Sequence, residues 1–132
     1  MGCQKRIKES IKGKRKKLVM KKGLQHLDKT EKDAVNSFVR KLRKELGNQI
    51  MNIRLFGSKV RGDFEKDSDI DIFILVGIKG DIGDKISDIA AEYFLEYNVP
   101  LAPVVYSLFE YERNKELGSF FFEKVEKEGV AL

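Results

Sequence analysis

Hydrophobic residues recur at helical spacing in two long segments of the chain. The first segment starts at Thr30, whose hydroxyl is suited to capping a helix that has Asp33 at the capping-box position, and it ends at Gly47 and Asn48. The second follows a glycine-containing loop and covers four turns. Their apolar members are Ala34, Val35, Phe38, Val39, Leu42 and Leu46, and then Ile82, Ile86, Ile89, Ala90, Tyr93, Phe94 and Tyr97.

Three shorter segments show the period of two that is typical of β-strands: 49–56, 69–76 and 101–107. The third contains Pro103, which lacks the amide that a central strand needs, so we expect this strand at an edge of the sheet or irregular there. We expect Met51, Ile53 and Leu55 to share one face of the first strand, and Ile70, Ile72, Ile74 and Val76 to share one face of the second.

The C-terminal part of the chain predicts one or two closing helices. Ser107 with Glu110, and then Ser119, precede helical segments, and the last of these ends at Gly129. The order of elements predicts an α/β (α+β) fold, in which a short mixed β-sheet has helices packed on one face. An aromatic group is consistent with core packing or with a surface for a partner or a second copy, since three consecutive Phe cannot all face inward: Tyr106, Phe109, Tyr111, Phe120, Phe121 and Phe122.

Composition limits the class of protein. The chain has 132 residues, 42% of them hydrophobic, which suffices for one domain with a real core and is too short for two. The single cysteine, Cys3, excludes an internal disulfide framework and a cysteine-built zinc site, and it suits a reducing compartment, so we expect a cytoplasmic protein. No segment approaches the roughly 18 consecutive apolar residues of a membrane span, and no signal-peptide pattern is present.

The net charge of +5 is unevenly distributed. Residues 1–22 hold ten Lys and Arg and one Glu, whereas the rest of the chain holds 16 basic and 20 acidic residues. We interpret 1–22 as a basic extension and 23–132 as the folded domain. The extension would serve as an arm that contacts nucleic acid or another acidic surface, or it is a solvated tail, or it results from translation upstream of Met20.

Chemistry is concentrated around the first two strands. Gly57 and Ser58 follow the first strand, where a glycine turn and free helical amides would hold phosphate oxygens. Asp69 and Asp71 lie two apart in the second strand and would project together. Paired carboxylates suit Mg²⁺, and two such ions would support an in-line displacement at phosphorus.

Each of these features also has an ordinary structural explanation. A Gly-Ser turn is common, and an Asp-x-Asp pair often belongs to a turn, a cap or a solvent-facing surface. Lys59 and Arg61 would add positive charge at a phosphate site or point to solvent. His26, the one histidine, fits a surface role better than a catalytic role. The combination of the turn and the carboxylates, in this order and spacing, is what makes the signal specific.

That combination resembles a known family. Gly57-Ser58-x-x-Arg61-Gly62 followed by Ser68-Asp69-Ile70-Asp71-Ile72 is similar to the signature of the minimal nucleotidyltransferases of the DNA polymerase beta superfamily. The resemblance implies transfer of a nucleotidyl group from a nucleoside triphosphate, most simply ATP, to a hydroxyl, with loss of pyrophosphate. It implies that Asp69 and Asp71 are catalytic and hold two Mg²⁺, and that the nucleotide contacts are Gly57, Ser58, Lys59, Arg61 and Ser68.

The resemblance also implies a protein partner, and one carboxylate of the family pattern is absent from this sequence. Such proteins are often encoded beside a small helical partner of the HEPN type, as toxin–antitoxin pairs. The family usually has a third carboxylate on the strand after the second helix, but 101–107 contains no Asp or Glu. A general base worth about 10²- to 10⁴-fold in rate would then be missing. The alternative function is therefore a catalytically weak or inactive antitoxin-like subunit that masks its partner or forms a homodimer.

Overall fold

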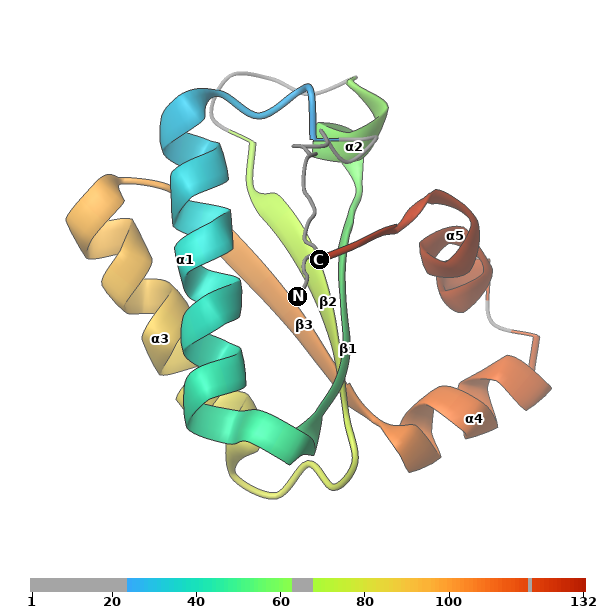
Figure 1. Cartoon of the computed structure of the whole chain (residues 1–132). Coiled ribbons are helices and arrows are strands. Elements are labelled where there is room, and N and C mark those ends of the chain that lie inside the picture. The colour runs from blue at the N-terminus through green and yellow to red at the C-terminus, as the bar shows by residue number, and fades with distance from the viewer. Residues whose placement is uncertain (1–23, 63–67, 119) are drawn as a thin grey trace, which may run out of the picture.

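The computed structural model describes residues 24–62, 68–118 and 120–132. Its elements alternate between helix and strand around one sheet (Figure 1). The helices are α1 (Lys29–Leu46), α2 (Ser58–Arg61), α3 (Ile82–Tyr97), α4 (Leu108–Glu116) and α5 (Phe120–Glu128), with a short 3-10 turn, η2 (Gly47–Gln49). The strands are β1 (Ile50–Phe56), β2 (Ile70–Val76), β3 (Leu101–Ser107) and β4 (Val130–Ala131).

The four strands form one mixed sheet in the order β3-β2-β1-β4. β2 pairs antiparallel with β1 and parallel with β3, and β4 adds a short antiparallel edge to β1. β3 lies at the other edge, which confirms the expectation from Pro103. The C-terminal β4 was not predicted, because two residues carry no readable period. The α/β fold class is confirmed.

The N-cap of α1 lies two residues before Thr30, the predicted cap. Asp28 is the N-cap: its side chain accepts a hydrogen bond from the Glu31 amide, and the Glu31 side chain accepts one from the Asp28 amide. The prediction that Thr30 caps the helix with Asp33 is therefore wrong, since Thr30 already lies inside the first turn. Asp28 and Glu31 are three residues apart, like Thr30 and Asp33, and they form the capping box.

The first face of the sheet is covered by α1 and α3, which lie side by side in Figure 1. The predicted apolar stripe of α1 and the part of the α3 stripe from Ile82 to Tyr93 meet the apolar face of β2 there. Phe94 and Tyr97, which we also predicted in the α3 stripe, are exposed instead. The Ser37 hydroxyl is 2.7 Å from the Tyr93 hydroxyl, and the Phe38 and Tyr93 rings meet edge to face at 5.8 Å. Burial of these stripes supplies the main core.

β1 departs from the predicted alternation at its start. Its pairing register with β2 shifts between Ile50 and Asn52, so one residue is left out of step. Ile50 and Ile53 are consequently both buried, while Met51 is 49% exposed. The prediction that Met51 shares a face with Ile53 is therefore wrong.

The second face of the sheet carries a smaller aromatic core under α5. Phe122 is 2% exposed, and its ring lies 4.8 Å from Tyr106, 5.1 Å from Tyr111 and 6.0 Å from Phe73. These rings pack as core, and α5 adds a layer beyond the helices that we predicted on one face. Phe109 on α4 is 71% exposed. The side chain of Phe120 and the whole of Ser119 lie outside the described residues.

α4 starts as the sequence predicts. Ser107 is its N-cap and forms a capping box with Glu110, whose carboxylate accepts a hydrogen bond from the Ser107 amide at 2.9 Å. That backbone hydrogen bond, with help from the charge of Lys79, lowers the pKa of Glu110.

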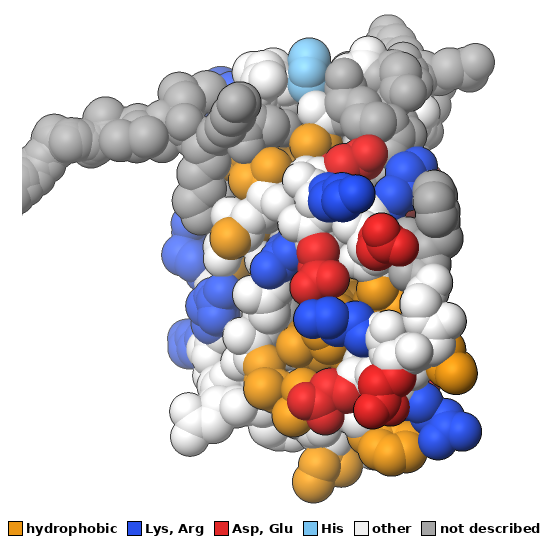
Figure 2. Space-filling view, turned by 90° about the vertical axis from the view of Figure 1, so that its right-hand side faces the viewer, with side chains coloured by type: hydrophobic (Ala, Val, Ile, Leu, Met, Phe, Trp, Pro, Cys, Tyr) orange, Lys and Arg blue, Asp and Glu red, His pale blue; other side chains and the backbone are white. Residues whose placement is uncertain are grey.

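Two surface properties bear on possible partners. On the side of the molecule that carries α4 and α5, Lys and Arg alternate with Asp and Glu, and hydrophobic side chains gather toward its lower end (Figure 2). In the part of the chain that the structure describes, no helix is both long enough and apolar enough to cross a membrane. The basic segment 1–22 lies outside the described residues, so its role stays a prediction.

We expect Phe122→Ala to lower the free energy of unfolding by about 3–5 kcal/mol, because it opens a cavity in the aromatic core. Phe109→Ala, the same substitution at an exposed position of α4, should change it by less than about 0.5 kcal/mol. Urea unfolding of both variants measures the difference. Equal effects would show that α5 does not pack against the sheet as described.

Candidate functional site

The candidate site lies at the end of the sheet where the interior strand β1 ends and its neighbour β2 begins. Phe56, the last residue of β1, pairs directly with Asp71 on β2. The chain then turns sharply at Gly57, whose φ of +85° is one that L side chains rarely adopt. The Val60 amide donates to the Gly57 carbonyl at 3.0 Å, which starts the single turn of α2.

Gly57 and Asp71 are in direct contact. A methyl group added to Gly57 would overlap Oδ2 of Asp71 and would come within 3.2 Å of its Cγ. Only a residue without a side chain leaves room for this carboxylate beside the turn. The structure thus brings together two of the residues that the motif predicts, one for the phosphate turn and one for the metal.

Asp69 is the residue directly before β2, so it lies at the same end of the sheet. It is exposed, and its position is set by a hydrogen bond from the Ile70 amide to the Pro100 carbonyl at 2.8 Å. Ser68, just before it, is half-buried. Ser58 and Arg61 belong to α2 by their backbones, but their side chains lie outside the described part of the structure.

The donor chemistry of the two aspartates fits magnesium. Mg²⁺ is usually held by one or two carboxylates together with substrate phosphates and waters. Asp71 beside the turn and the exposed Asp69 supply two such carboxylates. Among the residues described, no group of three or more His, Cys, Asp or Glu side chains is placed to hold a metal.

The position of the missing third carboxylate can be read from the sheet. Asp71 pairs in register with Ala102 on the parallel strand β3, and paired residues of neighbouring strands point to the same face. Two residues further along, Phe73 pairs with Val104. The place beside Asp71 on this strand is therefore occupied by a methyl group.

Lys59 is buried and paired with a carboxylate of α1. Its side chain is 1% exposed, and its Nζ donates to Oε2 of Glu31 at 2.8 Å. The carboxylate of Glu31 is 14% exposed and belongs to the first turn of α1. Sequence reasoning missed Glu31, because the motif carries no sign of which distant carboxylate the lysine meets.

His26 contacts the other end of the α2 turn. Gly62 has a φ of +89°, and a methyl group added there would lie 2.8 Å from Cε1 and 2.9 Å from Nε2 of the imidazole. His26 is half-buried. The glycine that ends the motif thus leaves room for this ring.

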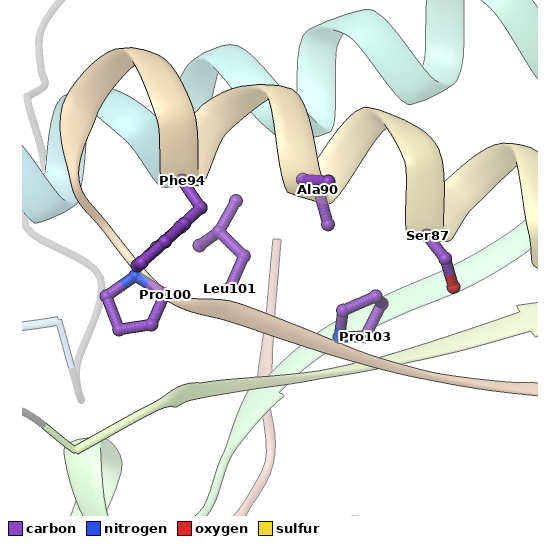
Figure 3. A pocket seen from close by; sticks show the side chains of 7 residues that line it. Ser87, Ala90, Phe94, Pro100, Leu101 and Pro103 are labelled. Carbon is purple, nitrogen blue, oxygen red and sulfur yellow. The ribbon is translucent and has the colours of Figure 1, made fainter.

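Two hollows flank the site on the side of Asp69. One, of about 530 Å³, lies beside Asp69 and is lined by the start of α1 and by Phe94, Tyr97 and Pro100. The other, of about 410 Å³, lies between α3 and the edge strand and runs from Phe94 and Pro100 to Ser87 and Pro103 (Figure 3). They share Phe94 and Pro100, so they are neighbours along one edge of the sheet.

Comparisons with known proteins bear on this site. Residues 35–129 match the family model described as a nucleotidyltransferase domain. Two proteins of Methanocaldococcus jannaschii, each named "Putative protein adenylyltransferase", are similar. One is 36% identical over 103 residues, which is 77% of this chain and 97% of that protein. The other is 30% identical over 102 residues, which is 76% of this chain and 96% of that protein.

We expect Gly57→Ala to be more destabilising than Gly47→Ala. Both glycines have positive φ, so both substitutions carry backbone strain of about 1–3 kcal/mol. Around Gly47 nothing lies within 4 Å of an added methyl group, whereas at Gly57 that group meets Asp71. Denaturant unfolding of the two variants isolates the collision, and an equal loss of stability would contradict the contact.

Proposed function

The chain belongs to the nucleotidyltransferase domain family, and from this premise we propose that it transfers AMP from ATP to a hydroxyl group of a protein. Family membership supports nucleotidyl transfer as the activity. The relatives that are named for protein adenylylation support ATP as donor and a protein as acceptor. The alternative of an inactive binding subunit is not favoured by these relatives.

The contact between Gly57 and Asp71 is the observation that carries the proposal. In it, the glycine turn that starts α2 lies directly beside a carboxylate, which supports a phosphate site next to a metal site. Phosphate oxygens would be bound by the turn, with Gly57 and Ser58 at the β and γ phosphates. Asp71 and Asp69 would hold Mg²⁺ at the α phosphate.

The reaction is an in-line displacement. The acceptor oxygen forms a bond to the α-phosphorus, the bond from that phosphorus to the bridging oxygen breaks, and pyrophosphate leaves with the bonding electrons. Bound Mg²⁺ would polarise the α phosphate and stabilise charge on the entering and leaving oxygens. By holding that metal, Asp69 and Asp71 would align the reacting groups for the displacement.

The proton of the acceptor hydroxyl has no carboxylate of β3 to receive it. Ala102 stands beside Asp71, so the proton would pass to a metal-site carboxylate or to water. General-base assistance is typically worth about 10²- to 10⁴-fold. We therefore propose an enzyme of low turnover, in which binding and alignment contribute more than proton transfer.

The acceptor would be a separate protein. The hollow beside Asp69 lies next to the reacting groups and is open to an incoming side chain. A small helical protein encoded beside this one, of the type that the motif resemblance implies, is the first acceptor to test, within a toxin–antitoxin pair. A second copy of the chain and a nucleic acid bound by residues 1–22 are further partners to test.

We expect Asp69→Asn and Asp71→Asn each to weaken magnesium-dependent ATP binding at least tenfold, because each removes a charged ligand. Asp84→Asn, an exposed position at the far end of α3, should leave binding unchanged. Calorimetric titration of ATP with and without Mg²⁺ measures this. Full magnesium-dependent binding by the Asp69→Asn, Asp71→Asn double variant would contradict the proposal.

We also expect Ala102→Asp to raise the rate of AMP transfer by about tenfold or more, because it restores a carboxylate beside Asp71. Ala102→Asn has nearly the same shape without the charge and should not raise the rate. Pyrophosphate release in the presence of acceptor measures both variants. Similar rates for the two variants would show that this position does not support a base.

A further inference from the structure

We infer that Lys59 is a positioning residue that holds the phosphate turn through Glu31 and does not itself bind phosphate; the inference rests on the proposed function. The sequence places Lys59 in the motif, directly after Ser58, where a phosphate contact would be the first interpretation. The structure provides a different partner for its charge.

The burial of the lysine argues against a phosphate contact. With 1% of its side chain exposed, Lys59 is among the largest fully buried side chains of the described chain. Binding a phosphate in place of Glu31 would move its ammonium out of the 2.8 Å contact with that carboxylate. That movement would leave a carboxylate that is 14% exposed without its cation, and removing one partner of a buried pair is strongly unfavourable.

Glu31 links this ion pair to the start of α1. One carboxylate oxygen, Oε1, accepts from the Asp28 amide at 2.9 Å, and the other, Oε2, accepts from Lys59 at 2.8 Å. The Asp28 side chain accepts from the Glu31 amide at 2.8 Å in return. Both oxygens of Glu31 are therefore engaged, and α2 is attached to a helix cap whose own geometry is fixed.

The segment that fixes α2 lies outside the motif. Glu31 holds the first turn of α2 through Lys59, and His26 packs on Gly62 directly after its last residue. A helix of four residues has no length to stabilise itself. Its position relative to Asp71 must come from such contacts. Residues 26–31 also precede the segment 35–129 that matches the family model.

The two roles of Lys59 predict opposite effects for Glu31→Gln. If Lys59 positions the turn, loss of the Glu31 charge loosens α2 and weakens binding of ATP with Mg²⁺. If Lys59 binds phosphate, the same substitution frees its ammonium from a competing carboxylate, and binding stays the same or tightens.

The experiment compares Lys59→Met, Glu31→Gln and the double variant by calorimetric titration of ATP with Mg²⁺. We expect each single variant to weaken binding about tenfold, and we expect the double variant to be no weaker than either single variant. Lys59→Arg should restore part of the affinity, because it keeps the pair with Glu31. The matched control is Lys29→Met with Asp33→Asn, an exposed pair on the same turn of α1, which should leave binding unchanged.

A second measurement needs no nucleotide. The amide of Val60 donates to Gly57 within the phosphate turn, so its hydrogen exchange reports how firmly the turn is held. Exchange at Val60, relative to amides of α3, should accelerate in Lys59→Met and in Glu31→Gln and not in the control.

The outcomes separate the two proposals. Tighter or unchanged ATP binding in Glu31→Gln, or unchanged Val60 exchange in both single variants, would overturn the positioning role. If the natural sequence shows no magnesium-dependent ATP binding, the proposed function fails. In that case accelerated exchange at Val60 would still support the attachment of α2 through Lys59, and unchanged exchange would overturn that too.

Discussion

The burial of β2 on both of its faces is the constraint on which the rest of this structure depends. One face carries Ile70, Ile72 and Ile74 against α1 and α3, and the other carries Phe73 and Leu75 under α5. A strand that is apolar on both sides must be the interior strand of its sheet, because an edge or a bare face would expose those side chains to water. β1 and β3 accordingly flank it, and helices cover it on both sides.

Asp71 is the exception in that strand, and its surroundings explain the glycine beside it. A carboxylate among apolar neighbours is unfavourable unless donors or cations compensate for its lost hydration. At Asp71 the chain turns at Gly57 with no side chain between them, which leaves room for the carboxylate at this end of the sheet. The second core covers the sheet further along, around Phe73 and Phe122. The candidate site thus occupies the part of that face where the aromatic core stops.

Much of the fold could be predicted from periodicity, and the failures have local physical causes. The sequence offers two candidate capping boxes, from Asp28 and from Thr30, and spacing alone does not choose between them. Glu31 decides in favour of Asp28, because its carboxylate can cap the helix and meet Lys59 at the same time. The register shift near Met51 depends on pairing with β2, which one strand's own sequence does not report.

The helix on the second face of the sheet was not predicted, although the sequence of β2 indicates that such a cover is needed. Phe73 and Leu75 alternate with the isoleucines of β2, so its second face is apolar too and needs a cover of its own. The closing helix with Phe122 was the available element. The motif predicted the residues of the turn and the carboxylates, since those follow from chemistry at fixed spacing. The partner of Lys59 and the contact of His26 depend on how the start of α1 folds back over α2, which no short motif encodes.

The position of Lys59 also bears on how a nucleotide would be held. A buried ion pair is seldom the most stabilising arrangement, since apolar side chains of similar volume often stabilise as well or better. The advantage of an ion pair is that its geometry is specific. The hydrogen bond between Nζ of Lys59 and Oε2 of Glu31 fixes the position of α2, a helix too short to be stable alone. The consequence is electrostatic. With the Lys59 charge paired with Glu31, much of the triphosphate's charge in the proposed function would be left to the turn and to a cation held by Asp69 and Asp71. Nucleotide affinity in the proposed site would then depend strongly on magnesium, which would join the turn and the two carboxylates into one binding unit.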